Sequence, residues 1–190
     1  MTVLAVDETL NNPVFDKLVK EHYKKYCVIW DLDGVLANCD HRLHYIVADR
    51  SNPDWESFHK YTMEDTPIES GRILFWALDM LGISQFICTA RPESNREMTE
   101  AWLQKYEIKP VEKLFMRKPN DFRSGHEVKL DMLKTIWEMG YEVLMAFDDH
   151  PEIVNMYRMS SVPCYAADPR HWHENTVQQI AANFIKKVQQ

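Results

Sequence analysis

Cysteine is scarce in this sequence and is not arranged in close pairs. The four cysteines are Cys27, Cys39, Cys88 and Cys164, and no C-x-x-C pair occurs. This spacing supports neither a disulfide scaffold nor a zinc site built from cysteine pairs. Isolated thiols of this kind are typical of proteins in a reducing compartment, and we therefore predict a cytoplasmic location.

Long apolar runs and export signals are also missing. No hydrophobic run approaches the roughly 20 residues that a membrane-spanning helix needs. The opening residues, MTVLAVDETLNN, lack the basic start and the small-residue cleavage site of a secretory signal. We therefore expect no membrane partner and no export.

Positive charge is in deficit, because the formal net charge is −7 at pH 7. A broad nucleic-acid-binding surface uses clustered lysine and arginine to displace counterions, so this balance argues against one. The charge balance does not exclude a local basic pocket. Glycine is rare as well, with 5 residues in 190, and low-complexity tracts are absent, which excludes a disordered chain.

Alternating apolar patterns predict the fold. Short apolar runs predict strands at 26–30, 83–88, 114–116, 143–147 and 162–167. Helical spacing of apolar residues predicts helices at 67–81, 94–106, 126–139 and 151–159. We expect Ser94 and Glu97 to form a capping box at the start of the second helix. The alternation indicates an α/β fold with a Rossmann-like parallel sheet and helices on both faces.

A polar insertion separates the first strand from the first of these helices. We expect a single domain, 1–190, whose core comprises 26–38 and 67–167, with a small helical cap at about 39–66. A terminal helix is predicted at about 171–190. The sequence leaves open whether 1–25 and 171–190 cover a sheet edge or form the contact of a homodimer.

Polar side chains follow each predicted strand. These residues are Asp31 and Asp33, then Thr89 and Arg91, then Asp148 and Asp149. Ligands bind beyond the carboxyl ends of the strands in open parallel sheets. Several carboxylates together require a cation, and an all-oxygen set favours Mg²⁺. We predict that Asp31, Asp33, Asp148 and Asp149 bind Mg²⁺; in an alternative, Asp149 caps the next helix and Asp148 alone is the ligand.

The same strand ends offer groups that bind phosphate. Thr89 supplies a hydroxyl, Arg91 a guanidinium, and either Lys129 or Lys118 an ammonium group. Catalysis at a phosphoryl group depends on positioning and on charge stabilisation. We therefore predict that Asp31 is a nucleophile that forms an aspartyl-phosphate, and that Asp33 protonates the leaving oxygen and later activates water.

Four segments carry a family resemblance. They read DLDGVLANCDHRL, CTARPESNREMTEAWL, MRKPNDFRSGHEVKLDML and FDDHPEIVNMYR. In this order they resemble the haloacid dehalogenase phosphatase superfamily, and within it the 3′-phosphatase domain of the polynucleotide kinases typical of bacteriophages. The resemblance spans roughly residues 26 to 167. It implies a Mg²⁺-dependent enzyme of nucleic-acid repair that acts on 3′-phosphates, with Arg42 and Arg91 in contact with the substrate phosphate.

The chain departs from the family pattern at two places. Val35 stands where a threonine is usual, and 124–127 reads SGHE where related domains carry acidic residues. No GxxxxGK[ST] loop occurs, so we expect a phosphatase that stands alone without kinase activity. The second departure weakens the transfer of substrate specificity.

Two other functions remain open from the sequence. The acidic net charge favours a phosphatase of free nucleotides, because a small substrate needs no extended basic surface. A catalytically silent binding protein or a receiver-like module would keep the fold without turnover. In the cap, Trp55, Phe58 and Tyr61 have helical spacing and either stack on a base or form the core of the cap; we expect a core role.

Overall fold

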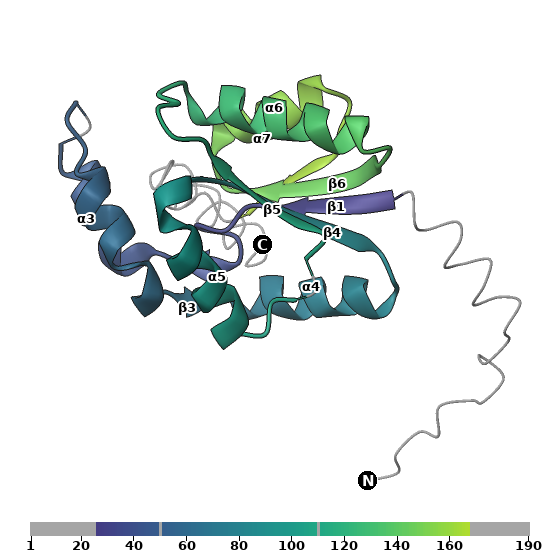
Figure 1. The fold of residues 1–190 in the computed structure, drawn as a ribbon, viewed down its shortest axis with the longest axis horizontal. Helices are drawn as coiled ribbons and strands as arrows, with labels where there is room; N and C mark the ends of the chain where they lie inside the picture. The colour runs from purple at the N-terminus through teal and green to yellow at the C-terminus, as the bar shows by residue number, and fades with distance from the viewer. Residues whose placement is uncertain (1–25, 50, 110, 168–190) are drawn as a thin grey trace, which may run out of the picture.

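The computed structural model describes residues 26–49, 51–109 and 111–167, so 1–25 and the predicted helix at 171–190 lie outside the described residues. Its centre is a five-stranded sheet in the order β5-β4-β1-β6-β7 (Figure 1). The strands are β1 (Tyr26–Trp30), β4 (Ser84–Pro92), β5 (Lys113–Arg117), β6 (Glu142–Asp148) and β7 (Cys164–Ala166). All neighbours pair in parallel, which confirms the predicted Rossmann-like α/β fold.

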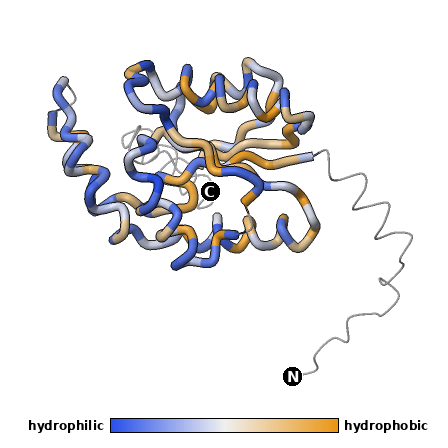
Figure 2. Tube along the Cα trace, in the orientation of Figure 1, coloured by the Kyte–Doolittle hydropathy of each residue, from blue (hydrophilic) through white to orange (hydrophobic). Residues whose placement is uncertain are grey.

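Helices cover both faces of the sheet (Figure 1). One face carries α6 (Gly125–Glu138) and α7 (Pro151–Met159), and the other carries α4 (Glu69–Met80) and α5 (Arg96–Lys105). The central strand β1 is buried on both faces, since its alternate residues enter two separate hydrophobic clusters. Figure 2 shows hydrophobic residues along the central strands. No helix within the described ranges is long and apolar enough to cross a membrane.

The starts of the helices differ in how they are capped. α6 begins with a capping box between Ser124 and Glu127. The capping box predicted for Ser94 and Glu97 is wrong, because the 3₁₀ turn η4 (Glu93–Asn95) precedes α5. This turn makes Asn95 the N-cap residue, and no side chain caps α5 there. Ser94 thus lies one residue too early in the chain to cap the helix.

The insertion after β1 forms a helical cap at the carboxyl ends of the strands (Figure 1). Its base is an antiparallel pair of short strands, β2 (Ala37–Asn38) and β3 (Thr66–Pro67). Between them lie η2 (Asp40–Arg42), α2 (His44–Val47), α3 (Trp55–Lys60) and η3 (Thr62–Glu64). The β2–β3 pair closes the insertion and thereby holds the cap beside the end of β1.

Candidate active site

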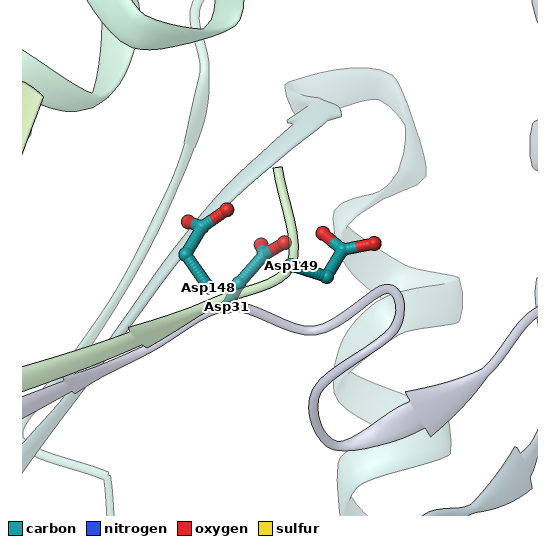
Figure 3. A group of neighbouring side chains, drawn as sticks. All are labelled: Asp31, Asp148 and Asp149. Carbon is teal, nitrogen blue, oxygen red and sulfur yellow. The ribbon is translucent and has the colours of Figure 1, made fainter. Parts of the chain in front are cut away.

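Three carboxylates from two neighbouring strands meet at the carboxyl edge of the sheet (Figure 3). Asp31 follows β1, Asp148 ends β6 and Asp149 comes next. Because β1 and β6 pair up to Trp30 and Phe147, the residues after them are adjacent. Each carboxylate offers an oxygen within 4.8 Å of the other two, and all three residues are buried. We call Asp31, Asp148 and Asp149 the carboxylate cluster.

Lys129 of α6 is bound to this cluster. Its Nζ lies 2.8 Å from Asp31 Oδ1 and 2.6 Å from Asp148 Oδ2, and its side chain is fully buried. Burial opposes the charged ammonium group, but the two carboxylates outweigh it and raise the pKa of Lys129. Lys118, the other lysine considered from the sequence, is exposed in the loop after β5. The structure therefore brings Lys129, and not Lys118, to the carboxylates.

The carboxylate cluster has the chemistry of a cation site. Burial raises the pKa of Asp31 well above its usual value; Lys129 opposes this shift, while Asp148 and Asp149 add to it by repulsion. A divalent cation between the three carboxylates would offset that repulsion. Three oxygen donors without a thiol or imidazole match the preference of Mg²⁺. These three residues thus fit a Mg²⁺ ion.

The glycine after the two aspartates is required by this cluster. Gly34 has φ +80°, and a Cβ atom at this position would overlap the carboxylate of Asp149. A side chain would therefore both strain the backbone and displace a candidate metal ligand. Val35, at the position of the family's threonine, packs in the hydrophobic cluster that includes Phe75 of α4.

Asp33 lies apart from the carboxylate cluster and faces two arginines. Its carboxylate accepts hydrogen bonds from Arg91 Nε at 3.0 Å and Nη2 at 2.5 Å, and from Arg42 Nη2 at 2.5 Å. The structure thus joins three of the four carboxylates predicted to bind the metal. The alternation expected for a strand ends at Leu32, whose carbonyl accepts from the backbone N–H groups of Leu36 and Ala37 and turns the chain.

Asp65 completes this second group and was not predicted from the sequence. Its carboxylate accepts from Arg42 Nε and Nη2, both at 2.6 Å, and from Arg91 Nη2 at 2.9 Å. Its backbone carbonyl accepts from Trp102 Nε1 of α5 at 2.9 Å, which fixes it in place. Asp65 directly follows the 3₁₀ turn η3 and not a strand, so the pattern of polar residues after strands gives no signal for it. We call Asp33, Asp65, Arg42 and Arg91 the arginine cluster.

The arginine cluster has capacity for a further anion. Burial works to raise the pKa of Asp33, but Arg91 and Arg42 outweigh it and hold that pKa well below its usual range. Arg91 is 1% exposed, and among the described residues its buried Nη1 has no hydrogen-bond partner. An unpartnered guanidinium nitrogen is costly to bury and suits a phosphate oxygen.

Thr89 lies within β4, just beyond the residues of this strand that pair with β1. Ile87 pairs with Trp30, so Thr89, two residues further on, lies next to the start of the Asp31–Asp33 segment. Its Oγ1 accepts from the backbone N–H of Arg91 at 3.2 Å, and its side chain is buried. All six residues predicted for catalysis and phosphate binding therefore lie on the carboxyl side of the sheet.

Comparisons with known proteins identify the family. The sequence pattern of the family described as the polynucleotide kinase PNKP phosphatase domain matches residues 25–172. A comparison with curated proteins found no match. A solved structure of a Pnkp1/Rnl/Hen1 complex contains a chain that is 25% identical, with a TM-score of 0.63. That match covers 75% of this chain and 45% of the other, so this protein corresponds to less than half of that chain's length.

More distant structures share the fold. A hydrolase of the haloacid dehalogenase-like family from Streptococcus pneumoniae is 12% identical, with a TM-score of 0.54 over 74% of this chain and 83% of its own. A predicted phosphatase from Clostridium acetobutylicum is 11% identical, with a TM-score of 0.57 over 75% and 83%. These structures share the fold alone, and the family match covers most of the chain. The chain belongs to the family of polynucleotide kinase PNKP phosphatase domains and is a phosphatase of the haloacid dehalogenase superfamily.

Proposed function

We propose that this phosphatase is Mg²⁺-dependent, acts through an aspartyl-phosphate on Asp31, and removes 3′-phosphates from nucleic-acid ends. One observation carries the proposal: the carboxylate of Asp31 belongs to a buried cation-type site, while the next acid along the chain, Asp33, is held by arginines. One of these arginines, Arg91, keeps a buried donor without a partner among the described residues. The negatively charged oxygens of a phosphate ester would suit both a cation at the first site and the unpartnered donor of Arg91.

In the first half of the reaction, a carboxylate oxygen of Asp31 attacks the phosphorus. The ester P–O bond breaks, its electron pair goes to the leaving oxygen, and Asp33 gives that oxygen a proton. Lys129 lies 2.8 Å from Asp31 Oδ1 and supports the ionised form of the nucleophile. A Mg²⁺ ion held by the carboxylate cluster would reduce the negative charge that opposes the attack.

In the second half, Asp33 takes a proton from water, whose oxygen attacks the phosphorus of the aspartyl-phosphate. The bond between Asp31 and phosphorus breaks, and inorganic phosphate leaves. Arg91 and Arg42 hold Asp33 ionised without substrate. A bound phosphate competes for the same guanidinium groups, which raises the pKa of Asp33 and lets it take from solvent the proton that it donates in the first half.

The family and the cap support a nucleic-acid end as substrate. The family is described by its link to polynucleotide kinase, and a second solved structure with 25% identity is an RNA repair complex. Arg42 belongs to the cap, and its Nη1 donates to the carbonyl of Phe58 at 3.1 Å, so the cap and the phosphate-binding group form one unit. The part of the substrate that is attached to the phosphate would therefore lie against the cap.

The test is phosphate release measured side by side from several substrates. We would compare a 3′-phosphorylated oligonucleotide, its 5′-phosphorylated isomer and free 3′- and 5′-nucleotides, each with Mg²⁺ and with EDTA. We expect Mg²⁺-dependent release with a preference for the 3′-phosphorylated oligonucleotide. Preference for free nucleotides would replace the proposed substrate class, and equal rates in EDTA would contradict the metal requirement.

We also propose a cytoplasmic location. Each of the four cysteines is buried with a free thiol, and burial raises the pKa of Cys27 and Cys164 to about 12. Protonated, buried thiols persist most readily in a reducing compartment. Fractionation of the source cells with an antibody to the protein would test this, and recovery in an exported fraction would contradict it.

A further inference from the structure

Helix α3 of the cap carries a stacked pair of rings at the edge of the site. The rings of Trp55 and His59 lie 5.9 Å apart between centroids at an interplanar angle of 21°. Phe58 is buried, as expected for the core of the cap, but Trp55 is 51% exposed and does not form part of that core. The expected core role thus holds for Phe58 and is wrong for Trp55.

His59 connects this pair to the arginine cluster. Its backbone carbonyl accepts from Thr62 Oγ1 at 2.8 Å and from Asn95 Nδ2 at 3.2 Å, which fixes the end of α3. The charges of Asp33, Arg91 and Arg42 act on its ring. Since Arg42 also holds the carbonyl of the preceding Phe58, the imidazole lies at the boundary between the cap and the phosphate-binding group.

Two buried polar atoms at this boundary have no hydrogen-bond partner among the described residues. They are Nη1 of Arg91 and Nδ1 of His59. An orphaned buried donor or acceptor costs free energy unless a ligand satisfies it. The guanidinium nitrogen suits an anion, whereas the imidazole suits a neutral polar group. Burial, aided by Arg91 and Arg42 and opposed by Asp33, lowers the pKa of His59 to about 4, so its ring is neutral at pH 7.

We propose that Trp55 and His59 bind the nucleoside that carries the scissile phosphate, with its sugar against His59 and its base stacked on Trp55. The order of groups in the site matches the order of groups in this ligand: Arg91 for the phosphate, His59 for the polar sugar, and exposed Trp55 for the flat base. Stacking on an aromatic ring accepts any base, so this contact gives affinity without sequence preference. The inference rests on the proposed function and names the part of the substrate that the cap reads.

The test separates base, sugar and phosphate with three substrates. They are a 3′-phosphorylated oligonucleotide, the same oligonucleotide with an abasic terminal sugar, and propyl phosphate. We expect Trp55→Ala to lower the ratio of kcat/KM for the normal over the abasic oligonucleotide by about 10-fold, the effect of one lost base–aromatic stack. Trp55→Tyr should restore most of it. His59→Ala should lower kcat/KM for both oligonucleotides relative to propyl phosphate.

Trp137→Ala is the matched control, because Trp137 is 42% exposed on α6, on the opposite face of the sheet from α4 and α5. It should change none of these ratios. An equal loss on all three substrates with Trp55→Ala, or an unchanged ratio between the two oligonucleotides, would overturn the role of Trp55. An unchanged ratio of the abasic oligonucleotide to propyl phosphate with His59→Ala would overturn the role of His59.

The result also separates this inference from the proposed function. Wild-type preference among phosphorylated substrates tests the function, and the ratios between variant and wild type test the two rings. If the wild type prefers free nucleotides, the same comparison is made between a 3′-nucleotide and the 3′-phosphate of the bare sugar. Loss of the normal-to-abasic ratio in Trp55→Ala would then still support the stack, and its retention would still overturn it.

Discussion

Asp31 and Asp33 are separated by one residue and lie in opposite electrostatic surroundings. Asp31 joins two further carboxylates, and burial raises its pKa well above the usual value. Asp33 faces Arg91 and Arg42, which hold its pKa well below the usual range. A single turn after Leu32 therefore divides the motif into one side that favours a cation and another that favours an anion. A phosphoryl site needs both.

The two sides also have different structural origins. The carboxylate cluster is built on the core, from β1, β6 and the residue that follows β6. The arginine cluster takes Arg42 from η2 and Asp65 from the end of the cap, and only Arg91 comes from a core strand. In the proposed mechanism, the core would supply the nucleophile and the metal ligands, while the cap would supply Arg42 and Asp65 to the group that binds phosphate.

The largest effect is expected from Asp31→Asn. Loss of the nucleophile should reduce kcat by about 10⁴-fold or more, as for a nucleophile that acts within a unit. Because burial disfavours the charge on Asp31, we expect the Tm measured in EDTA not to fall. Steady-state kinetics and thermal unfolding check both statements. Activity near the wild-type level would exclude Asp31 as nucleophile.

Asp33→Asn should have the next largest effect, with kcat reduced by about 10²- to 10⁴-fold through loss of the general acid and base. The loss should be smaller for aryl phosphates whose leaving phenol is acidic, because such a group departs without a proton. Mg²⁺ should still raise the Tm of Asp33→Asn, but not that of Asp31→Asn. The same loss for every leaving group would contradict the role as acid.

Asp65→Asn should act mainly on stability. The substitution removes one of two carboxylates from two buried arginines, and breaking a buried ion pair costs about 3–5 kcal/mol. Asp131→Asn is the control, since Asp131 pairs with Arg123 on the surface and such pairs contribute about 0–1 kcal/mol. Urea unfolding at equilibrium measures both. Equal, small losses would show that Asp33 alone can hold Arg42 and Arg91.

Much of the core could be predicted from the sequence because its signals are local. The run at 26–30 is strand β1, and the helix predicted at 151–159 is α7, which starts with a proline at its first turn. Residues that follow parallel strands meet by geometry alone. The positions of Asp31, Asp148 and Asp149 therefore agree with the prediction, and Lys129 joins them because α6 packs over β4 and β6.

The arginine cluster was harder to predict from the sequence because contacts between distant segments build it. Its position just after the first strand grouped Asp33 with the predicted metal ligands, but the turn after Leu32 directs it to the arginines instead. Asp65 has no motif around it and is set by Arg42, Arg91 and Trp102. Hydrophobic spacing in α3 also does not reveal which aromatic ring of the cap faces solvent.

The smallest predicted effect concerns the start of the helix that carries Lys129. Glu127 accepts from the backbone N–H of Ser124 at 3.0 Å, and the Ser124 hydroxyl also donates to it. Ser124→Ala should lower the free energy of unfolding by about 1 kcal/mol. Ser94→Ala is the matched control: its sequence has the same S-x-x-E pattern, yet it caps no helix, so no loss is expected.

Urea unfolding of these two serine variants checks the prediction. The kcat of each variant shows whether the start of α6 also affects Lys129 and, through it, the carboxylate cluster. Lys129 lies in the second turn of α6, beyond the residues that a lost cap frays first, so Ser124→Ala should retain the kcat of the wild type. A fall in kcat confined to Ser124→Ala would instead show that the helix start controls the lysine. Equal destabilisation by both substitutions would contradict the assignment of the cap to Ser124. Ser94 caps no helix in the structure, so an equal loss would mean that the effect does not come from the cap of α6.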